Sequence, residues 1–151
     1  MIALYAHGQS IDGEVLVGQD NPEGSETLIG TASNDLILGE KGNDILAGGA
    51  GDDVLAGGEG FDLYLYTSAT DGNDRIEDSD GQGMIVVDGQ ALAGGIKKAG
   101  ETEWTSADGK FVYRLEGTDL KVAVNGRELT INEHFQSGQF GIRLTDVSAV
   151  A

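Results

Sequence analysis

The sequence GTASNDLILGEKGNDILAGGAGDDVLAGGEGFDLYL, residues 30–65, contains one nine-residue pattern four times. Position 1 of each unit is Gly, position 6 is Asp and position 8 is a large apolar residue. The position-6 column consists of Asp35, Asp44, Asp53 and Asp62. A fixed period of this length is typical of a solenoid, in which each unit packs only against its neighbours.

Weaker units flank the regular ones. Glu14-Val-Leu-Val and Glu26-Thr-Leu-Ile each lead into a Gly, as Asp35-Leu-Ile-Leu leads into Gly39, and Asp74 follows Asp62 by twelve residues. We therefore expect the repeat array to run from residue 12 to residue 87. Its irregular ends fit the capping units that a solenoid needs.

Each unit divides into a Gly-rich turn of six residues and a strand of three. Side chains alternate between the faces of a strand, so positions 6 and 8 point the same way, which we take to be inward. Gly permits positive φ and close backbone approach, so turn carbonyls can face inward as well. The ligand candidates are the Asp35, Asp44, Asp53 and Asp62 carboxylates, Asp74 and Glu26 at the degenerate ends, and the turn residues Gly42, Gly49, Gly51, Gly58, Gly60, Asn43 and Asp52.

An environment made of oxygen atoms alone suits a hard cation. Ca²⁺ fits best, because it takes six to eight oxygens and tolerates irregular geometry. Mg²⁺ demands a stricter octahedron, and transition metals favour His or Cys, which residues 12–87 lack. We expect Asn43 and Asp52, at position 5, to offer backbone carbonyls rather than side chains. Without a cation the position-6 carboxylates would stack at strand spacing, so the metal-free array should be unfolded or loose.

The pattern resembles the haemolysin-type calcium-binding family, the RTX nonapeptide repeats, and residues 48–56 match it at every position. Residues 39–47 depart at Glu40, residues 57–65 at Tyr64, and residues 30–38 at Thr31 and Ser33. The resemblance implies an all-β fold, a right-handed parallel β-roll in which units alternate between two sheets. It also implies about two to four Ca²⁺ between turns two units apart, with Asp35 paired with Asp53 and Asp44 with Asp62.

The second half loses the nine-residue period and shows ordinary strand patterns. We predict strands at 83–87, 96–98, 103–105, 111–115, 120–124, 128–131 and 141–144, with a hairpin at Asn125-Gly126. The predicted core of this half is Val112, Leu115, Leu120, Val122, Val124, Leu129, Ile131, Phe135, Phe140 and Ile142. Residues 84–146 resemble the haemolysin-type calcium-binding related domain, which implies a small antiparallel β region that caps the roll.

The predicted organisation is a terminal segment (1–11), the calcium-binding roll (12–87), the cap (88–146) and a tail (147–151). Positions 7 and 9 of the repeat should face outward, yet they are apolar, as in Leu36, Leu38, Ile45 and Leu63. Such a face suggests a cover, supplied either by this chain or by a partner, and the intramolecular cover is the simpler interpretation.

Composition narrows the function. The 151 residues carry a net charge of −17 and contain 25 Gly and no Cys. This charge argues against nucleic-acid binding, and the absence of Cys excludes disulfides and Cys-ligated metals. No apolar run is long enough to span a bilayer, so we expect no membrane insertion. Neither His7 nor His134 lies in a catalytic motif, and we expect no enzyme activity.

These observations favour a calcium-binding module, and the resemblance implies that it belongs to a secreted bacterial protein. The resemblance implies export by type I secretion machinery, folding on Ca²⁺ binding outside the cell, and a role in stabilising or presenting the parent protein. Residues 146–151 would be an export tail or simply the end of the chain. The alternative is a calcium-scaffolded module that binds carbohydrate or protein. Its candidates are Trp104 and a basic strip formed by Lys97, Lys98, Lys110, Arg114, Lys121 and Arg127.

Overall fold

A computed structural model describes residues 11–19, 24–131 and 135–147. The described residues form strands and one 3₁₀ helix, and the predicted all-β class is confirmed. The roll contains β1 (Val15–Val17), β2 (Thr27–Ile29), β3 (Leu36–Leu38), β4 (Ile45–Ala47), β5 (Val54–Ala56), β6 (Asp62–Tyr66), β7 (Arg75–Glu77) and β8 (Gly83–Val87). The second half contains β9 (Gln90–Ala91), β10 (Gly94–Lys98), β11 (Trp104–Thr105), β12 (Val112–Glu116), β13 (Asp119–Val124), β14 (Arg127–Ile131), η1 (Gln139–Gly141) and β15 (Arg143–Val147).

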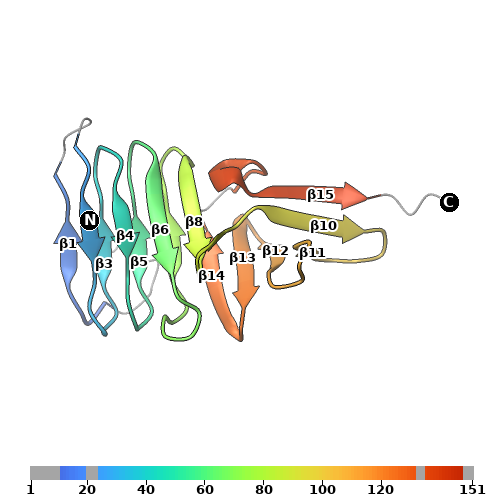
Figure 1. The fold of residues 1–151 in the computed structure, drawn as a ribbon, viewed down its shortest axis with the longest axis horizontal. Helices are drawn as coiled ribbons and strands as arrows, with labels where there is room; N and C mark the ends of the chain where they lie inside the picture. The colour runs from blue at the N-terminus through green and yellow to red at the C-terminus, as the bar shows by residue number, and fades with distance from the viewer. Residues whose placement is uncertain (1–10, 20–23, 132–134, 148–151) are drawn as a thin grey trace.

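The roll is a stack of parallel strands in two sheets (Figure 1). β1, β3, β5 and β7 form one sheet, and β2, β4, β6 and β8 form the other. Within each sheet the register pairs a residue with the one two units later, as Leu36 pairs with Val54 and Ile45 with Leu63. The predicted parallel β-roll with alternating sheets is therefore confirmed.

The apolar side chains at position 8 of the repeat fill the core of the roll. Ile37, Leu46, Leu55, Tyr64 and Ile76 are 0–2% exposed and belong to one apolar cluster. Because positions 6 and 8 share a face, the acids of position 6 also point inward, and they lie where each turn enters its strand. The strand periodicity thus places a row of carboxylates beside a dry core.

The cap continues the sheet of the roll rather than forming a separate one. β14 pairs in parallel with β7, and the order β1-β3-β5-β7-β14-β13-β12-β11-β10-β15 makes one ten-stranded sheet. The predicted hairpin lies between β13 and β14, where Asn125 (φ 47°) and Gly126 (φ 76°) both adopt left-handed conformations, as a tight hairpin requires. The last turn of the roll is therefore in direct contact with the cap.

The structure corrects several details of the second half. Val112 is half-buried whereas Phe111 and Tyr113 are buried, because alternation places Val112 on the opposite face of the strand. Leu115 shares the face of Tyr113 but is 49% exposed near the end of β12. Phe135 is only partly buried. The strand predicted at 141–144 begins two residues later, after η1, and the short strand β9 escaped prediction.

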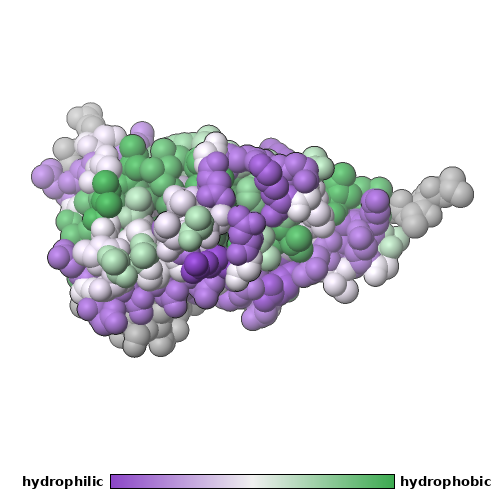
Figure 2. Space-filling model, turned by 60° about the horizontal axis from the view of Figure 1, so that its bottom comes forward, coloured by the Kyte–Doolittle hydropathy of each residue, from purple (hydrophilic) through white to green (hydrophobic). Residues whose placement is uncertain are grey.

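The outer faces of the two roll sheets differ. Leu36 and Val54 are fully buried outside the core cluster, so this face is covered by the same chain. On the other sheet Ile29, Leu65 and Met84 are 65%, 38% and 38% exposed. Figure 2 shows apolar residues over the roll, the left half of the view, among polar ones. The expected cover thus extends over β3 and β5, whereas Val15 and Val17 of β1 in the same sheet are 42% and 59% exposed.

Candidate metal sites

The acidic residues of the repeat form two columns, one on each long edge of the roll. On the first edge, turns 39–44, 57–61 and 78–82 lead from one sheet to the other, and Glu26, Asp44 and Asp62 lie there. On the second edge, turns 30–35, 48–53 and 67–74 carry Asp35, Asp53 and Asp74. The structure therefore places Asp35 next to Asp53 and Asp44 next to Asp62.

One oxygen of each carboxylate is held by the backbone of the neighbouring turn. The Oδ1 atoms of Asp53, Asp62 and Asp74 accept hydrogen bonds from the backbone N–H of Asp35 (2.8 Å), Asp44 (2.9 Å) and Asp53 (2.9 Å). Asp44 Oδ1 accepts one from the Glu26 N–H at 3.1 Å. This ladder fixes the orientation of every carboxylate before any ligand is present.

The second oxygen has no partner. The Oδ2 atoms of Asp44, Asp53, Asp62 and Asp74 are buried and accept no hydrogen bond. Buried polar atoms are nearly always paired, so four orphaned oxygens at equivalent positions require an explanation. Asp35 differs, because its Oδ2 accepts a hydrogen bond of 2.6 Å from the N–H of Thr31, at position 2 of its unit.

Beside two position-1 glycines, Gly39 and Gly30, a carboxylate oxygen faces a backbone carbonyl across a small space. The point where a Cβ of Gly39 would lie is 2.8 Å from Asp44 Oδ2 and 2.7 Å from the carbonyl oxygen of Gly57. The equivalent point at Gly30 is 2.5 Å from both Asp35 Oδ2 and the carbonyl oxygen of Gly48. Only Gly keeps this space open. Carboxylate and carbonyl oxygens thus converge on one position.

The position-1 carbonyls were absent from the predicted ligands. Gly39, Gly48 and Gly57 belong to the invariant first column of the repeat, and that invariance was the available signal. The predicted residues at positions 2 and 4 shape the turns: Gly42, Gly49, Gly51, Gly58 and Gly60 all have φ between 83° and 111°. Glu40 takes the same left-handed conformation, with φ 70°, which is strained for a residue with a Cβ.

Position 5 builds a second ladder toward the surface. Asn43 Oδ1 accepts a hydrogen bond of 2.8 Å from the N–H of Phe61, and Asp52 Oδ1 accepts one of 2.8 Å from the N–H of Asn73. These oxygens tie one turn to the next. The arrangement agrees with the expected role of Asn43 and Asp52 as turn residues.

Burial and like charge both disfavour the ionised carboxylates. Burial first, and then neighbouring carboxylates, raise the pKa of Asp53 and of Asp62 to about 7. The same causes raise the pKa of Asp74 to about 8. At neutral pH the columns therefore hold carboxylates that lack a cationic neighbour and would be stabilised by one.

The donor set fits a cation that accepts backbone ligands. Among the described residues no three side chains of His, Cys, Asp or Glu come close enough to hold a metal by themselves. An ion at these positions would take paired carboxylates from two turns and complete its shell with carbonyl oxygens. Hard cations with many oxygen ligands, Ca²⁺ above all, have these requirements.

The features suggested for glycan binding have structural roles. Trp104 is 8% exposed, donates from Nε1 to Asp146 at 2.8 Å and lies 4.5 Å from the Lys97 ammonium. Arg114 pairs with Glu128 at 2.7 Å and Lys121 with the same carboxylate at 3.9 Å. Three of the six basic residues in the strip, Lys97, Arg114 and Lys121, therefore pair with acids of the cap.

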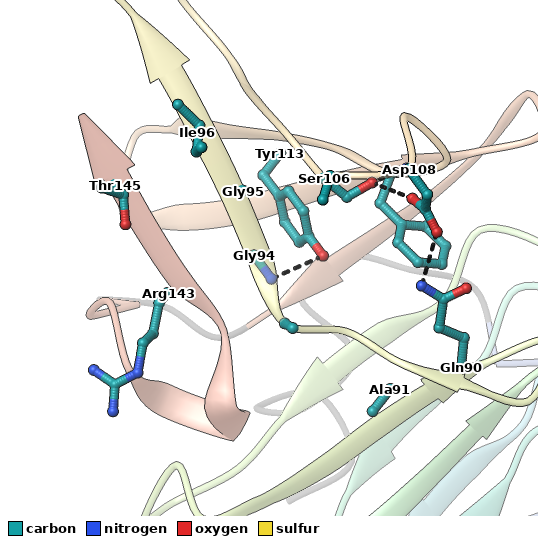
Figure 3. A pocket seen from close by; sticks show the side chains of 13 residues that line it. Gln90, Ala91, Gly94, Gly95, Ile96, Ser106, Asp108, Tyr113, Arg143 and Thr145 are labelled. Atoms are coloured by element: carbon teal, nitrogen blue, oxygen red, sulfur yellow. Dashed lines mark hydrogen bonds between the residues drawn. The ribbon is translucent and has the colours of Figure 1, made fainter. Parts of the chain in front are cut away.

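A pocket of about 420 Å³ opens between β10, β15 and the loop at 106–108 (Figure 3). Asp108 accepts hydrogen bonds there from Gln90 and Ser106, which lower its pKa to about 2, so it is a poor proton acceptor. His7 and His134 lie outside the described residues. Within the described ranges no helix combines the length and apolar character needed to cross a membrane.

Comparison with known proteins agrees with this geometry. Residues 29–64 match the RTX calcium-binding nonapeptide repeat in four copies. No curated protein matches the chain. The matched segment contains Asp35, Asp44, Asp53 and Asp62, and these repeats identify the roll as a calcium-binding β-roll module.

Proposed function

Because residues 29–64 are RTX calcium-binding nonapeptide repeats, we propose that this chain is a module whose folding depends on Ca²⁺. The observation that carries the proposal is the set of four buried Oδ2 atoms without a partner on Asp44, Asp53, Asp62 and Asp74. Each is held in place by the ladder of the other oxygen, so the sites are oriented by the fold.

The proposed ligands come from pairs of turns on one edge. Asp44 and Asp62 serve a site on the first edge, Asp35 and Asp53 serve one on the second, and Asp74 extends the second column beyond Asp53. Carbonyl oxygens of the position-1 glycines complete the shells. Asp35 and Glu26 are the weaker candidates, because both oxygens of Asp35 already accept hydrogen bonds and Glu26 Oε1 accepts one of 2.6 Å from the Gln19 N–H. The arrangement supports two to four ions.

Bound Ca²⁺ supplies positive charge and replaces the missing hydrogen-bond donors. Without it, the fold brings carboxylates together at a strand spacing of about 4.8 Å. At an effective dielectric constant of about 20, each such contact costs roughly 3 kcal/mol. Since a small domain is stable by only about 5–15 kcal/mol, a few contacts of this size decide whether the roll forms.

This dependence suits a protein exported through a narrow channel. Extracellular calcium modules bind with dissociation constants of about 10⁻⁴–10⁻³ M, far above cytoplasmic Ca²⁺ levels. The chain would remain unfolded and competent for type I secretion inside a bacterial cell. It would fold outside, where it stabilises or presents the protein that carries it. Its role is then structural rather than enzymatic.

Circular dichroism tests the proposal. The far-ultraviolet spectrum of the purified chain is recorded in chelator and during a calcium titration to 10 mM, with Mg²⁺ as the matched control. We expect a disordered or loose spectrum in chelator and in Mg²⁺, and a β-rich one above about 1 mM Ca²⁺. A chain fully folded in chelator and unchanged by Ca²⁺ would contradict the proposal.

A further inference from the structure

The gap between turns 57–61 and 78–82, the last one on the first edge, differs from the others. A Cβ added at Gly39 would meet Asp44 Oδ2 and the carbonyl oxygen of Gly57. A Cβ added at Gly57 would meet Asp62 Oδ2 and, in place of a carbonyl, the hydroxyl of Tyr64. A phenol oxygen thus occupies the place that a backbone oxygen takes one turn earlier.

Tyr64 is the residue that departs from the aliphatic pattern at position 8. Its side chain is 1% exposed, and its hydroxyl accepts a hydrogen bond of 2.8 Å from the Gly57 N–H. The same hydroxyl donates to Asp78 Oδ2 at 2.6 Å. The phenol therefore bridges turn 57–61 and turn 78–82, the two walls of the gap.

Asp78 stands where the repeat would place its next position-1 glycine, because Ala56 pairs with Glu77 in the sheet. Its Oδ1 accepts hydrogen bonds from the N–H groups of Asp80 (3.2 Å) and Gly81 (3.0 Å). Both carboxylate oxygens are thus satisfied by the protein, in contrast to the orphaned Oδ2 of Asp62.

The end of the column is also closed from outside. Phe140, in η1, packs edge-on against Tyr64 with ring centroids 6.0 Å apart, and its N–H donates to the Gly81 carbonyl at 3.1 Å. Figure 1 shows η1 beside the end of β8 where turn 78–82 enters it. On the second edge the buried phenol of Tyr66 donates to carbonyl oxygens of the turn that follows its own strand, at Asp71 and Gly72.

We propose that Tyr64 terminates the calcium column on the first edge: its hydroxyl and Asp78 take the place of an ion in the last gap. Asp62 then ligates one ion only, through Oδ1 on its Asp44 side, while its Oδ2 lies beside the Tyr64 hydroxyl and binds no ion. This inference rests on the proposed function, because it assumes that the preceding gap binds Ca²⁺. It identifies Tyr64 as the residue that limits the number of ions on this edge.

The test is the number of Ca²⁺ bound per chain at 10 mM Ca²⁺, measured by equilibrium dialysis and elemental analysis. The wild type is compared with Tyr64→Phe, Asp78→Asn and the double variant, each checked for folding by circular dichroism. Tyr64→Phe keeps the ring packing but frees the Asp78 carboxylate, and we expect it to bind one ion more than the wild type. Asp78→Asn keeps an acceptor for the hydroxyl and should leave the number unchanged. The double variant should bind the same number of ions as the wild type.

Two results would overturn the inference: one ion fewer in Asp78→Asn, which would make Asp78 a ligand, or no gain in a folded Tyr64→Phe. If Tyr64→Phe does not fold, the Asp78→Asn count decides by itself, an unchanged count supporting the inference and a loss overturning it. A wild type that binds no Ca²⁺ would overturn the proposed function as well. If the wild type binds Ca²⁺ but the variants bind numbers of ions other than those expected, only the inference about Tyr64 is overturned.

Discussion

Removing the charge of Asp53 should stabilise the fold in chelator and destabilise it in calcium. This residue stands in the middle of the second column, next to Asp35 on one side and Asp74 on the other, and its Oδ2 is buried without a partner. Asp53→Asn keeps an oxygen for the Asp35 N–H but removes the charge. The variant therefore separates the cost of the buried carboxylate from its value as a ligand.

The magnitudes follow from the pKa and from linkage. Folding raises the pKa of Asp53 from 3.8 to about 7, so above pH 7 its charge destabilises the metal-free fold. At about 1.4 kcal/mol per pKa unit, and discounting for solvent screening, we expect Asp53→Asn to stabilise the metal-free fold by about 2–4 kcal/mol. Each site at 100 times its dissociation constant contributes about 2.7 kcal/mol, and Asp53 serves two. In calcium the variant should then be less stable than the wild type by about 1–3 kcal/mol.

The assay is urea unfolding at pH 7.5, in chelator and in 10 mM Ca²⁺, followed by circular dichroism. Asp52→Asn is the matched control, since it removes the same charge one residue away but keeps the ladder oxygen that binds the Asn73 N–H. The control should fold and bind ions like the wild type. An Asp53→Asn chain that is weakened in chelator, or unaffected in calcium, would refute the reasoning.

Three further predictions concern the turns and the buried acids. In chelator, lowering the pH from 8 to 5 should increase β-structure by circular dichroism. The pKa values of Asp53, Asp62 and Asp74 are about 7 to 8 in the folded chain and 3.8 in the unfolded chain. The free-energy cost of ionising these carboxylates in the fold is therefore absent below about pH 4 and grows as the pH rises to 8. Loss of structure on acidification to pH 5 would contradict this. Glu40→Gly should raise stability in calcium by about 1 kcal/mol, seen as a higher melting temperature, because Gly adopts the left-handed φ of 70° without strain. Glu59→Gly is the control, since it removes the same charge at a residue without that strain. Equal effects of the two substitutions would disprove the explanation. Gly39→Ala should lower the number of bound Ca²⁺ by one, because the new Cβ would lie 2.8 Å from Asp44 Oδ2. Gly100→Ala is the control: its Cβ would be strained but would lie in open space, so it should lower stability without changing the number of ions. An unchanged number of ions in Gly39→Ala would show that the space beside Gly39 holds no ion.

The regular half of the fold was predictable because its signal is local and repeated. The nine-residue period sets the strand length, the alternation of sheets and the inward direction of Asp35, Asp44, Asp53 and Asp62 at once. The pairing of carboxylates follows from the two-sheet arrangement that the repeat implies. Four repeat units in the same phase are not compatible with most other folds.

The remainder depends on tertiary contacts that carry no period. Tyr64 looked like a mere departure from the pattern, and only its hydrogen bonds to Gly57 and Asp78 reveal its role. The continuation of the roll sheet through β7 and β14 joins residues more than fifty positions apart. Val112 was assigned to the core because it is apolar, but it lies on the strand face opposite Tyr113. Leu115 lies on the face of Tyr113 and is nevertheless exposed near the end of the strand.

A crystal structure grown in calcium, with anomalous scattering used to locate the ions, tests the central claim most directly. The account predicts density between turns 39–44 and 57–61 at Asp44 Oδ2, and between turns 30–35, 48–53 and 67–74 at Asp53 Oδ2. It predicts no ion between Gly57 and Asp78. Ions bound only at surface acids, with the Oδ2 atoms of Asp44 and Asp53 still unliganded, would contradict it.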